Sequence, residues 1–94
     1  MKLSIVVTVY NEEENIVPLI ENVQNAMINH SYELIFVDDG SSDKTIPNIK
    51  ANADENTRLV VLNKNYGQTA AMAAGIDKAN GDFIVTIDGD LQND

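Results

Sequence analysis

The chain has no cysteine, no tryptophan and only two prolines among its 94 residues. The absence of cysteine excludes a disulfide framework, a cysteine-ligated metal centre and thiol catalysis, and it fits a reducing compartment. Basic residues are scarce as well: six Lys and Arg stand against fifteen Asp and Glu, for a formal net charge of −9. Because nucleic-acid binders carry a basic face, this balance argues against a nucleic-acid partner.

Long apolar runs are also missing. The apolar stretches are a few residues long, whereas a spanning helix needs roughly 20 apolar residues and a secretory signal about 7–15. We therefore expect a cytoplasmic location. The hydrophobic content of 44% is ordinary for a globular domain, and the length allows one domain at most.

Short β-branched runs alternate with stretches of helical periodicity. We expect strands over residues 3–9, 34–37, 59–62 and 83–87, and helices from about 15, over 44–53 and over 69–79. Asn15 is predicted to cap the start of the first helix, and Asn80-Gly81 to cap the end of the third. This β-α-β-α-β-α-β order predicts an α/β fold, a three-layer parallel sheet with helices on both faces.

The core of such a four-stranded sheet is marginal at this length. We therefore expect the chain to be the front part of something larger. An exposed sheet edge should follow, and unpaired edges invite pairing with another copy. We expect a dimer or a swapped assembly.

Polar residues gather where each predicted strand ends. In open parallel sheets ligands bind at these carboxyl ends, so four loops should converge on one rim. The polar segments are 8–11, 38–41, 63–67 and 88–90. Neither a GxxxxGK[ST] loop nor a GxGxxG motif is present, which disfavours P-loop hydrolysis and classical dinucleotide binding.

Asp88 and Asp90 form the first candidate site. Residues i and i+2 of an extended segment point to the same side, and two adjacent carboxylates repel unless a cation lies between them. Such hard oxygen ligands suit Mg²⁺ or Mn²⁺, with substrate phosphates completing the shell. A chain of net charge −9 would also need a cation to hold a diphosphate. The alternative is a polar turn that closes the strand.

Asp38, Asp39 and Tyr10 are the second group. A carboxylate at a strand end can accept a hydrogen bond from a ribose hydroxyl or a base N–H, or it can cap the following helix. An aromatic at Tyr10 can stack on a nucleobase, or it can be a half-buried rim tyrosine. The residues alone leave both alternatives open.

Four segments together resemble a known family. They are SIVVTVYNE (4–12), VDDGSSD (37–43), NYGQ (65–68) and DGDLQ (88–92). In order and spacing they resemble the inverting nucleotide-sugar glycosyltransferases of the GT-A fold. The run 63–68 and the D-x-D-L-Q ending most resemble the branch that acts on polyprenyl phosphates, which includes dolichol-phosphate and undecaprenyl-phosphate sugar transferases.

The resemblance implies roles for the nucleotide-binding residues. Tyr10 would lie against the nucleobase with Thr8 beside it. Asp39 would hydrogen-bond the base, and Asp38 would support the same pocket. Val9 stands where many relatives have proline, with little expected effect because the backbone is extended either way.

The resemblance also implies a metal and donor-diphosphate site. Asp88 would contribute to nucleotide binding and, with Asp90, to binding Mg²⁺ or Mn²⁺, and Asp90 is favoured as the direct ligand. The donor would be a nucleoside-diphosphate sugar, and the favoured acceptor a polyprenyl phosphate. Residues 1–94 would be the nucleotide-sugar-binding N-terminal portion of a truncated glycosyltransferase domain.

In this family the catalytic base and the acceptor loops follow the D-x-D segment, so the catalytic residues stay unassigned and the piece alone should be inactive. Membrane contact would come only from further C-terminal segments, at the cytoplasmic face. An alternative function is a non-catalytic module that binds a nucleotide or a phospho-ligand. A receiver-like domain is disfavoured because the chain lacks the lysine that such a pocket needs near its last strand.

Overall fold

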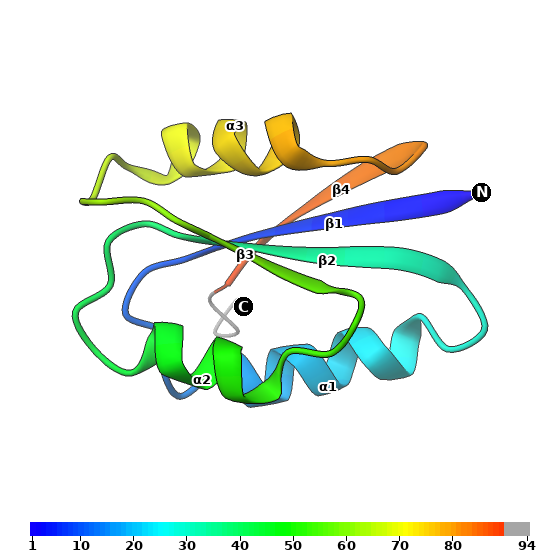
Figure 1. Cartoon of the computed structure of the whole chain (residues 1–94), viewed down its shortest axis with the longest axis horizontal. Coiled ribbons are helices and arrows are strands. Elements are labelled where there is room, and N and C mark those ends of the chain that lie inside the picture. The colour runs from blue at the N-terminus through cyan, green and yellow to red at the C-terminus, as the bar shows by residue number, and fades with distance from the viewer. Residues whose placement is uncertain (90–94) are drawn as a thin grey trace.

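The computed structural model describes residues 1–89, which form one parallel sheet with helices on both faces. The elements are β1 (Lys2–Val9), α1 (Ile16–Ala26), β2 (Ser31–Asp38), α2 (Thr45–Asn52), β3 (Thr57–Val61), α3 (Gln68–Lys78) and β4 (Phe83–Asp88). The strand order is β3-β2-β1-β4, and every pair is parallel (Figure 1). The predicted α/β class and element order are confirmed.

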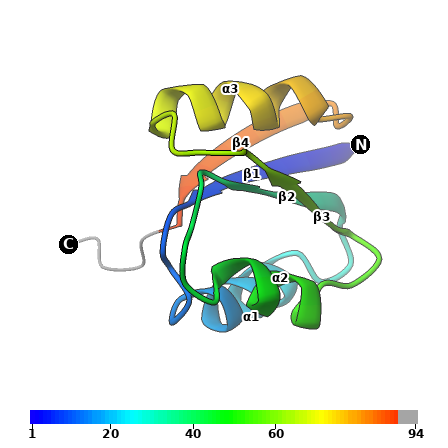
Figure 2. The same ribbon diagram turned by 60° about the vertical axis from the view of Figure 1, so that its left-hand side comes forward.

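Two apolar layers flank the sheet. α3 covers one face, while α1 and α2 cover the other (Figures 1 and 2). Side chains alternate along each strand, so Val7 and Phe36 pack toward α1 and α2 while Val6 and Val37 pack toward α3. The central strands β1 and β2 are therefore buried on both faces, as their unbroken apolar runs predict.

Small residues let α3 lie close to the sheet. A Cβ added at Gly75 would lie 2.4 Å from Val6 Cγ1 and 2.8 Å from Val37 Cγ2. Ala71, one turn earlier on the same helix, is fully buried. The alanine-rich composition of α3 thus serves packing.

The predicted position of the first helix cap, Asn15, is confirmed, whereas the predicted Asn80-Gly81 cap of the third helix is wrong. Helix α1 does begin directly after Asn15, but the Asn15 side chain donates from Nδ2 to Glu12 Oε1 and caps no backbone amide. Helix α3 ends through an extended Ala79, not through a left-handed glycine. Gly81 instead lets the α3–β4 turn lie close to β1, since a Cβ at this position would lie 2.5 Å from Ser4 Oγ.

The expected exposed edge is β4, an outer strand of this sheet. Phe83, Ile84 and Val85 are 55%, 43% and 40% exposed, although their side chains are apolar. An apolar groove of about 370 Å³ runs beside the strand, between α1 and β4. Residues from both elements line it, among them Leu19, Val23, Val85 and Ile87.

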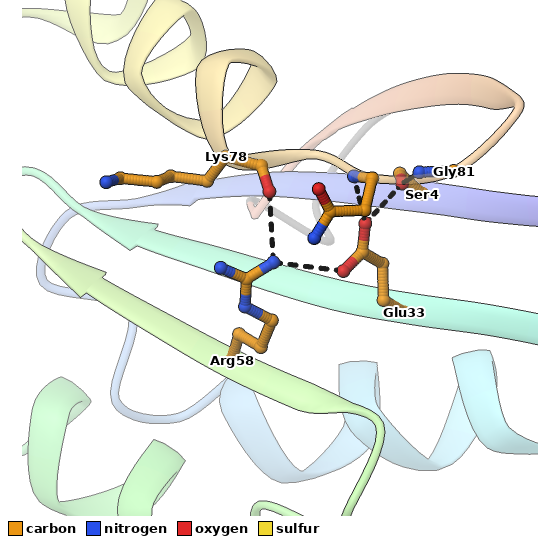
Figure 3. Close-up of polar contacts among 6 residues, drawn as sticks. Ser4, Glu33, Arg58, Lys78 and Gly81 are labelled. Atoms are coloured by element: carbon orange, nitrogen blue, oxygen red, sulfur yellow. Dashed lines mark hydrogen bonds and ion pairs between the residues drawn. The ribbon is translucent and has the colours of Figure 1, made fainter.

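A buried carboxylate ties the amino-terminal half of the sheet together (Figure 3). Glu33 of β2 accepts hydrogen bonds from the Ser4 hydroxyl at 2.5 Å and the Asn80 amide at 2.6 Å. Its other oxygen pairs with Arg58 Nη1 of β3 at 3.1 Å. Arg58 also donates to the Lys78 carbonyl at the end of α3, so the cluster joins three strands and the α3–β4 turn.

Burial raises the pKa of Glu33. The hydrogen bonds from Ser4, Asn80 and Arg58 outweigh that effect, so the net pKa is lowered from its ordinary value of 4.5. The carboxylate is therefore charged and stabilises the fold at neutral pH.

Within residues 1–89, no helix is both long enough and apolar enough to cross a bilayer.

Candidate functional site

A cavity of about 230 Å³ opens at the carboxyl ends of the strands, which lie at the left of Figure 1. The residues that line it are Thr8, Val9, Tyr10, Glu12, Asp39, Asn65, Gly67, Gln68 and Asp88. They come from the ends or following loops of all four strands. The structure therefore brings Thr8, Tyr10, Asp39 and Asp88 together around one cavity, as the strand-end rule predicts.

The sheet register explains why Thr8 and Asp88 are neighbours. The two residues are partners in the β1–β4 ladder, and Thr8 is also the partner of Val37 in the β1–β2 ladder. Partners in a parallel ladder point to the same face, so the hydroxyl and the carboxylate stand side by side at the rim.

Asp38 lies elsewhere. It is fully buried and is not among the residues that line the cavity. Its Oδ2 accepts the backbone amides of Gly40 and Ser41, at 3.2 and 2.9 Å, so it holds the turn that follows β2. Its Oδ1 is buried without a hydrogen-bond partner among the described residues. Contact between Asp38 and a nucleotide stays a prediction, and this geometry makes Asp38 a support of the turn.

Asp39 does line the cavity, and it is only 4% exposed. Its amide donates to the Val9 carbonyl at 2.9 Å, which continues the β1–β2 pairing. Its two carboxylate oxygens accept the amides of Tyr66 and Gly67. Asp39 therefore joins the loop after β2 to the loop after β3.

Tyr10 lines the cavity and is 48% exposed. The next residue, Asn11, has a φ of 51°, in the left-handed region that asparagine tolerates better than most residues. This turn sends the chain away from the sheet directly after Tyr10. One part of the tyrosine thus packs on the fold and another is open to a ligand; stacking on a base stays a prediction.

Reciprocal hydrogen bonds join the loop after β1 to the loop after β2. The Asn11 amide donates to Ser41 Oγ at 2.8 Å, and the Ser42 amide donates to Asn11 Oδ1 at 2.9 Å. Further along, the Glu12 amide donates to Thr45 Oγ1 at 2.8 Å. The cavity wall that carries Tyr10 is therefore braced by the loop that carries Asp39.

Asp43 secures the far end of these two loops. It accepts the amide and the hydroxyl of Thr45 and the amide of Glu13. Burial raises the pKa of Asp43, but these hydrogen bonds outweigh it and the net pKa is lowered. The carboxylate is therefore charged and stays an acceptor well into the acidic range.

Five lining residues were not among the predicted site residues: Val9, Glu12, Asn65, Gly67 and Gln68. The signal for two of them, Asn65 and Gly67, was present, because residues 63–67 follow a predicted strand. Nothing in the local pattern distinguished a cavity wall from a solvated loop. The loop is held by hydrogen bonds from the Tyr66 and Gly67 amides to Asp39, which lies more than 20 residues away in the sequence.

For a metal ion, the described cavity offers Asp88 as a hard oxygen donor at the end of β4. Asp90, the other predicted ligand, lies outside the described residues. Among residues 1–89, no three His, Cys, Asp or Glu side chains group so as to hold a metal. A site of one or two carboxylates completed by substrate phosphates is the type that Mg²⁺ uses, and the position of Asp88 fits it.

Comparison with known proteins gives consistent matches. The model of glycosyl transferase family 2 matches residues 4–94. The dodecaprenyl-phosphate galacturonate synthase of Rhizobium johnstonii is 50% identical over 99 residues, covering 100% of this chain and 29% of that protein. The undecaprenyl-phosphate 4-deoxy-4-formamido-L-arabinose transferase of Proteus mirabilis is 44% identical over 97 residues, covering 98% of this chain and 30% of that protein.

A solved structure agrees with the fold. Glucosyl-3-phosphoglycerate synthase from Mycobacterium tuberculosis, in complex with Mn²⁺, UDP and glucosyl-3-phosphoglycerate, superposes with a TM-score of 0.78 at 27% identity. The match covers 95% of this chain and 33% of that one. This chain thus spans about three tenths of the length of the curated relatives that it matches.

Proposed function

Because this chain belongs to glycosyl transferase family 2, we propose that it supplies the donor site of an enzyme that transfers a sugar from a nucleoside-diphosphate sugar to an acceptor. Residues 1–94 would form the nucleotide-sugar-binding N-terminal portion of the transferase domain. The observation that carries the proposal is the convergence of Thr8, Tyr10, Asp39 and Asp88, from three different strands and their loops, on one cavity.

The lining residues suggest how a donor would lie. The exposed part of Tyr10 offers a surface for the flat face of a nucleobase. Asp39 and the turn at Asn65–Gly67 would enclose the base and ribose. Asp88, at the end of β4, would lie toward the diphosphate end, and the buried sheet beneath excludes water from that side.

We propose that Asp88 and Asp90 would hold Mg²⁺ or Mn²⁺ together with the donor diphosphate. When bound, a divalent cation would neutralise the charge that develops on the leaving diphosphate. Support comes from the position of Asp88 in the cavity and from the Mn²⁺ and UDP named for the M. tuberculosis structure. The net charge of −9 also favours a cation between the chain and a polyanionic ligand.

The favoured acceptor is a polyprenyl phosphate. Of two relatives, the one at 50% identity is named a dodecaprenyl-phosphate galacturonate synthase and the one at 44% an undecaprenyl-phosphate 4-deoxy-4-formamido-L-arabinose transferase. The whole enzyme would then work at the cytoplasmic face of a membrane, where a water-soluble donor meets a lipid acceptor. We expect no sugar transfer from this chain alone, because the acceptor phosphate must be positioned by residues that the family places after the D-x-D segment.

Titration calorimetry with UDP and with GDP tests the donor site. In the presence of Mn²⁺ the chain should bind at least one of these nucleotides, and Asp88→Asn should weaken that binding by about tenfold or more, or about 1.4 kcal/mol. Removal of Mn²⁺ with a chelator should have an effect at least as large. Asp77→Asn, an exposed carboxylate on α3, is the matched control and should bind as the wild type does.

Two outcomes would count against this assignment. Nucleotide binding that ignores both Mn²⁺ and Asp88→Asn would favour a non-catalytic binding module of the same fold. Sugar transfer by the isolated chain would show that the catalytic residues lie within it.

We also propose that two copies of the chain associate through the β4 edge. The outer side of β4 presents backbone groups without a strand partner in the described sheet, next to exposed Phe83, Ile84 and Val85. A two-fold axis would bring the same edge of both copies together, pair the backbones and cover these side chains.

Light scattering over a concentration series tests this association. The wild type should approach dimer mass as concentration rises, and Val85→Lys should stay monomeric because it places charge in the paired edge. Val17→Lys is the matched control, since Val17 is exposed to a similar extent, 37%, but lies on α1. A wild type that is monomeric at high concentration contradicts the proposal.

A further inference from the structure

The segment that joins β3 to α3 carries two of the cavity-lining residues, Asn65 and Gly67, and a third, Gln68, begins α3. The Asp39 carboxylate holds the backbone of this segment. Its Oδ1 accepts the Tyr66 amide at 2.8 Å, and its Oδ2 accepts the Gly67 amide at 2.9 Å. A nearly buried carboxylate with both oxygens in charge-assisted hydrogen bonds is a strong anchor.

Gly40, the next residue, lets the two loops come together. It has a φ of 84°, and a Cβ at this position would lie 2.6 Å from the Asn65 nitrogen and 2.7 Å from the Lys64 carbonyl carbon. Any side chain here would push the β3–α3 segment away from Asp39. The sequence Asp39-Gly40 thus combines an anchor with the space that the anchored segment needs.

The anchored segment is also braced internally. The Tyr66 hydroxyl donates to Asn63 Oδ1 at 2.6 Å, and Lys64 Nζ lies 5.2 Å from the centroid of the Tyr66 ring. Gly67, whose φ is 102°, then turns the chain into α3. Because the segment is held within itself, the two hydrogen bonds at its end act on the segment as a unit.

We infer that Asp39 is a positioning residue that presets the Asn65–Gln68 wall of the donor cavity, and that it acts on nucleotide affinity through this wall. The ligand class in this inference, a nucleoside diphosphate, rests on the proposed function. The anchoring of the wall by Asp39 rests on the structure alone. It differs from the role that the family resemblance implies, in which Asp39 reads the base directly. A wall built of backbone and small polar groups should affect every nucleoside diphosphate alike.

Asp39→Asn tests the inference, because it keeps the size of the side chain but places an amide NH₂ against a backbone N–H. In the nucleotide-free protein, amide hydrogen exchange at Tyr66 and Gly67 should accelerate tenfold or more. Titration with UDP, GDP and CDP in Mn²⁺ should show a loss of affinity by a similar factor for every nucleotide that the wild type binds. Thermal unfolding measured alongside confirms that the variant is folded.

Gly40→Ala is the second variant, since it leaves the carboxylate in place and displaces the segment. It should reproduce both the faster exchange at Tyr66 and Gly67 and the uniform loss of affinity. Asp77→Asn, exposed on α3, is the control for charge and should change neither readout.

Each contrary result is decisive. Unchanged exchange at Tyr66 and Gly67 in Asp39→Asn would overturn the anchor. A loss confined to one nucleobase, with Gly40→Ala binding normally, would overturn the positioning role in favour of direct base recognition. If the wild type binds no nucleoside diphosphate, the proposed function fails, while the exchange measurement still decides whether Asp39 holds the wall.

Discussion

Alanine in place of Phe36 is expected to lower the free energy of unfolding by about 3–5 kcal/mol. Phe36 is fully buried on β2 and belongs to the apolar layer between the sheet and helices α1 and α2. Its removal would take away a large buried surface and leave a cavity that the neighbouring side chains fill only in part. Since a domain of this size has a total stability of about 5–14 kcal/mol, the variant should be close to unfolding at 37 °C.

The second phenylalanine of the chain provides the matched control. Phe83 lies on the outer strand β4 and is 55% exposed, so Phe83→Ala removes much less buried surface. We expect a loss below about 1 kcal/mol in the same urea or thermal unfolding experiment, in line with surface substitutions generally. If both variants lost the same free energy of unfolding, Phe83 would have to be buried in solution. The proposed association through the β4 edge would bury Phe83 in this way at high protein concentration. The comparison is therefore made at low micromolar concentration.

Replacement of Glu33 by glutamine is expected to destabilise the fold by about 1–3 kcal/mol at neutral pH, because hydrogen bonds to a charged group are replaced by weaker ones and an amide NH₂ faces donors. The folded pKa of Glu33 is lowered from its ordinary value of 4.5, although its burial alone raises it. As pH falls, the unfolded state therefore binds protons first. The stability that the charge contributes is fully present above about pH 4.5, the ordinary pKa, and is lost as the pH falls through the pKa of the folded state.

Urea unfolding between pH 7 and pH 3 measures this effect. The difference in stability between the wild type and Glu33→Gln should be largest at neutral pH and should shrink below pH 4.5. Glu14→Gln removes the same charge at an exposed position, and its stability should match that of the wild type at every pH. A difference between wild type and Glu33→Gln that stays constant with pH would mean that the carboxylate contributes through packing alone.

Glu33 and Asp39 show the same construction at opposite ends of the sheet. Each is a nearly buried carboxylate that accepts a backbone amide more than 25 residues away: Asn80 for Glu33, Tyr66 and Gly67 for Asp39. At the amino-terminal end the contacts join strands. At the carboxyl end they shape the cavity. In a chain with six basic residues, backbone amides supply much of the positive polarity that these carboxylates need.

What the sequence determined by itself is the order of elements, the α/β class and the rim on which the polar residues meet. These follow from local patterns: β-branched runs form strands, three- and four-residue spacings form helices, and parallel strands place their carboxyl ends at one edge. Thr8, Tyr10, Asp39 and Asp88 could be assigned to one rim for this reason, although the ligand that they hold stays a proposal.

Only the tertiary structure decided how the adjacent aspartates divide their work. Asp38 turns inward to hold Gly40 and Ser41, and Asp39 reaches across to Tyr66 and Gly67. Local pattern treats the two alike because both directly follow the strand predicted over residues 34–37. Their partners depend on which face each side chain takes and on which loop the close approach at Gly40 admits. These contacts exist only once distant segments have packed, so no local periodicity encodes them.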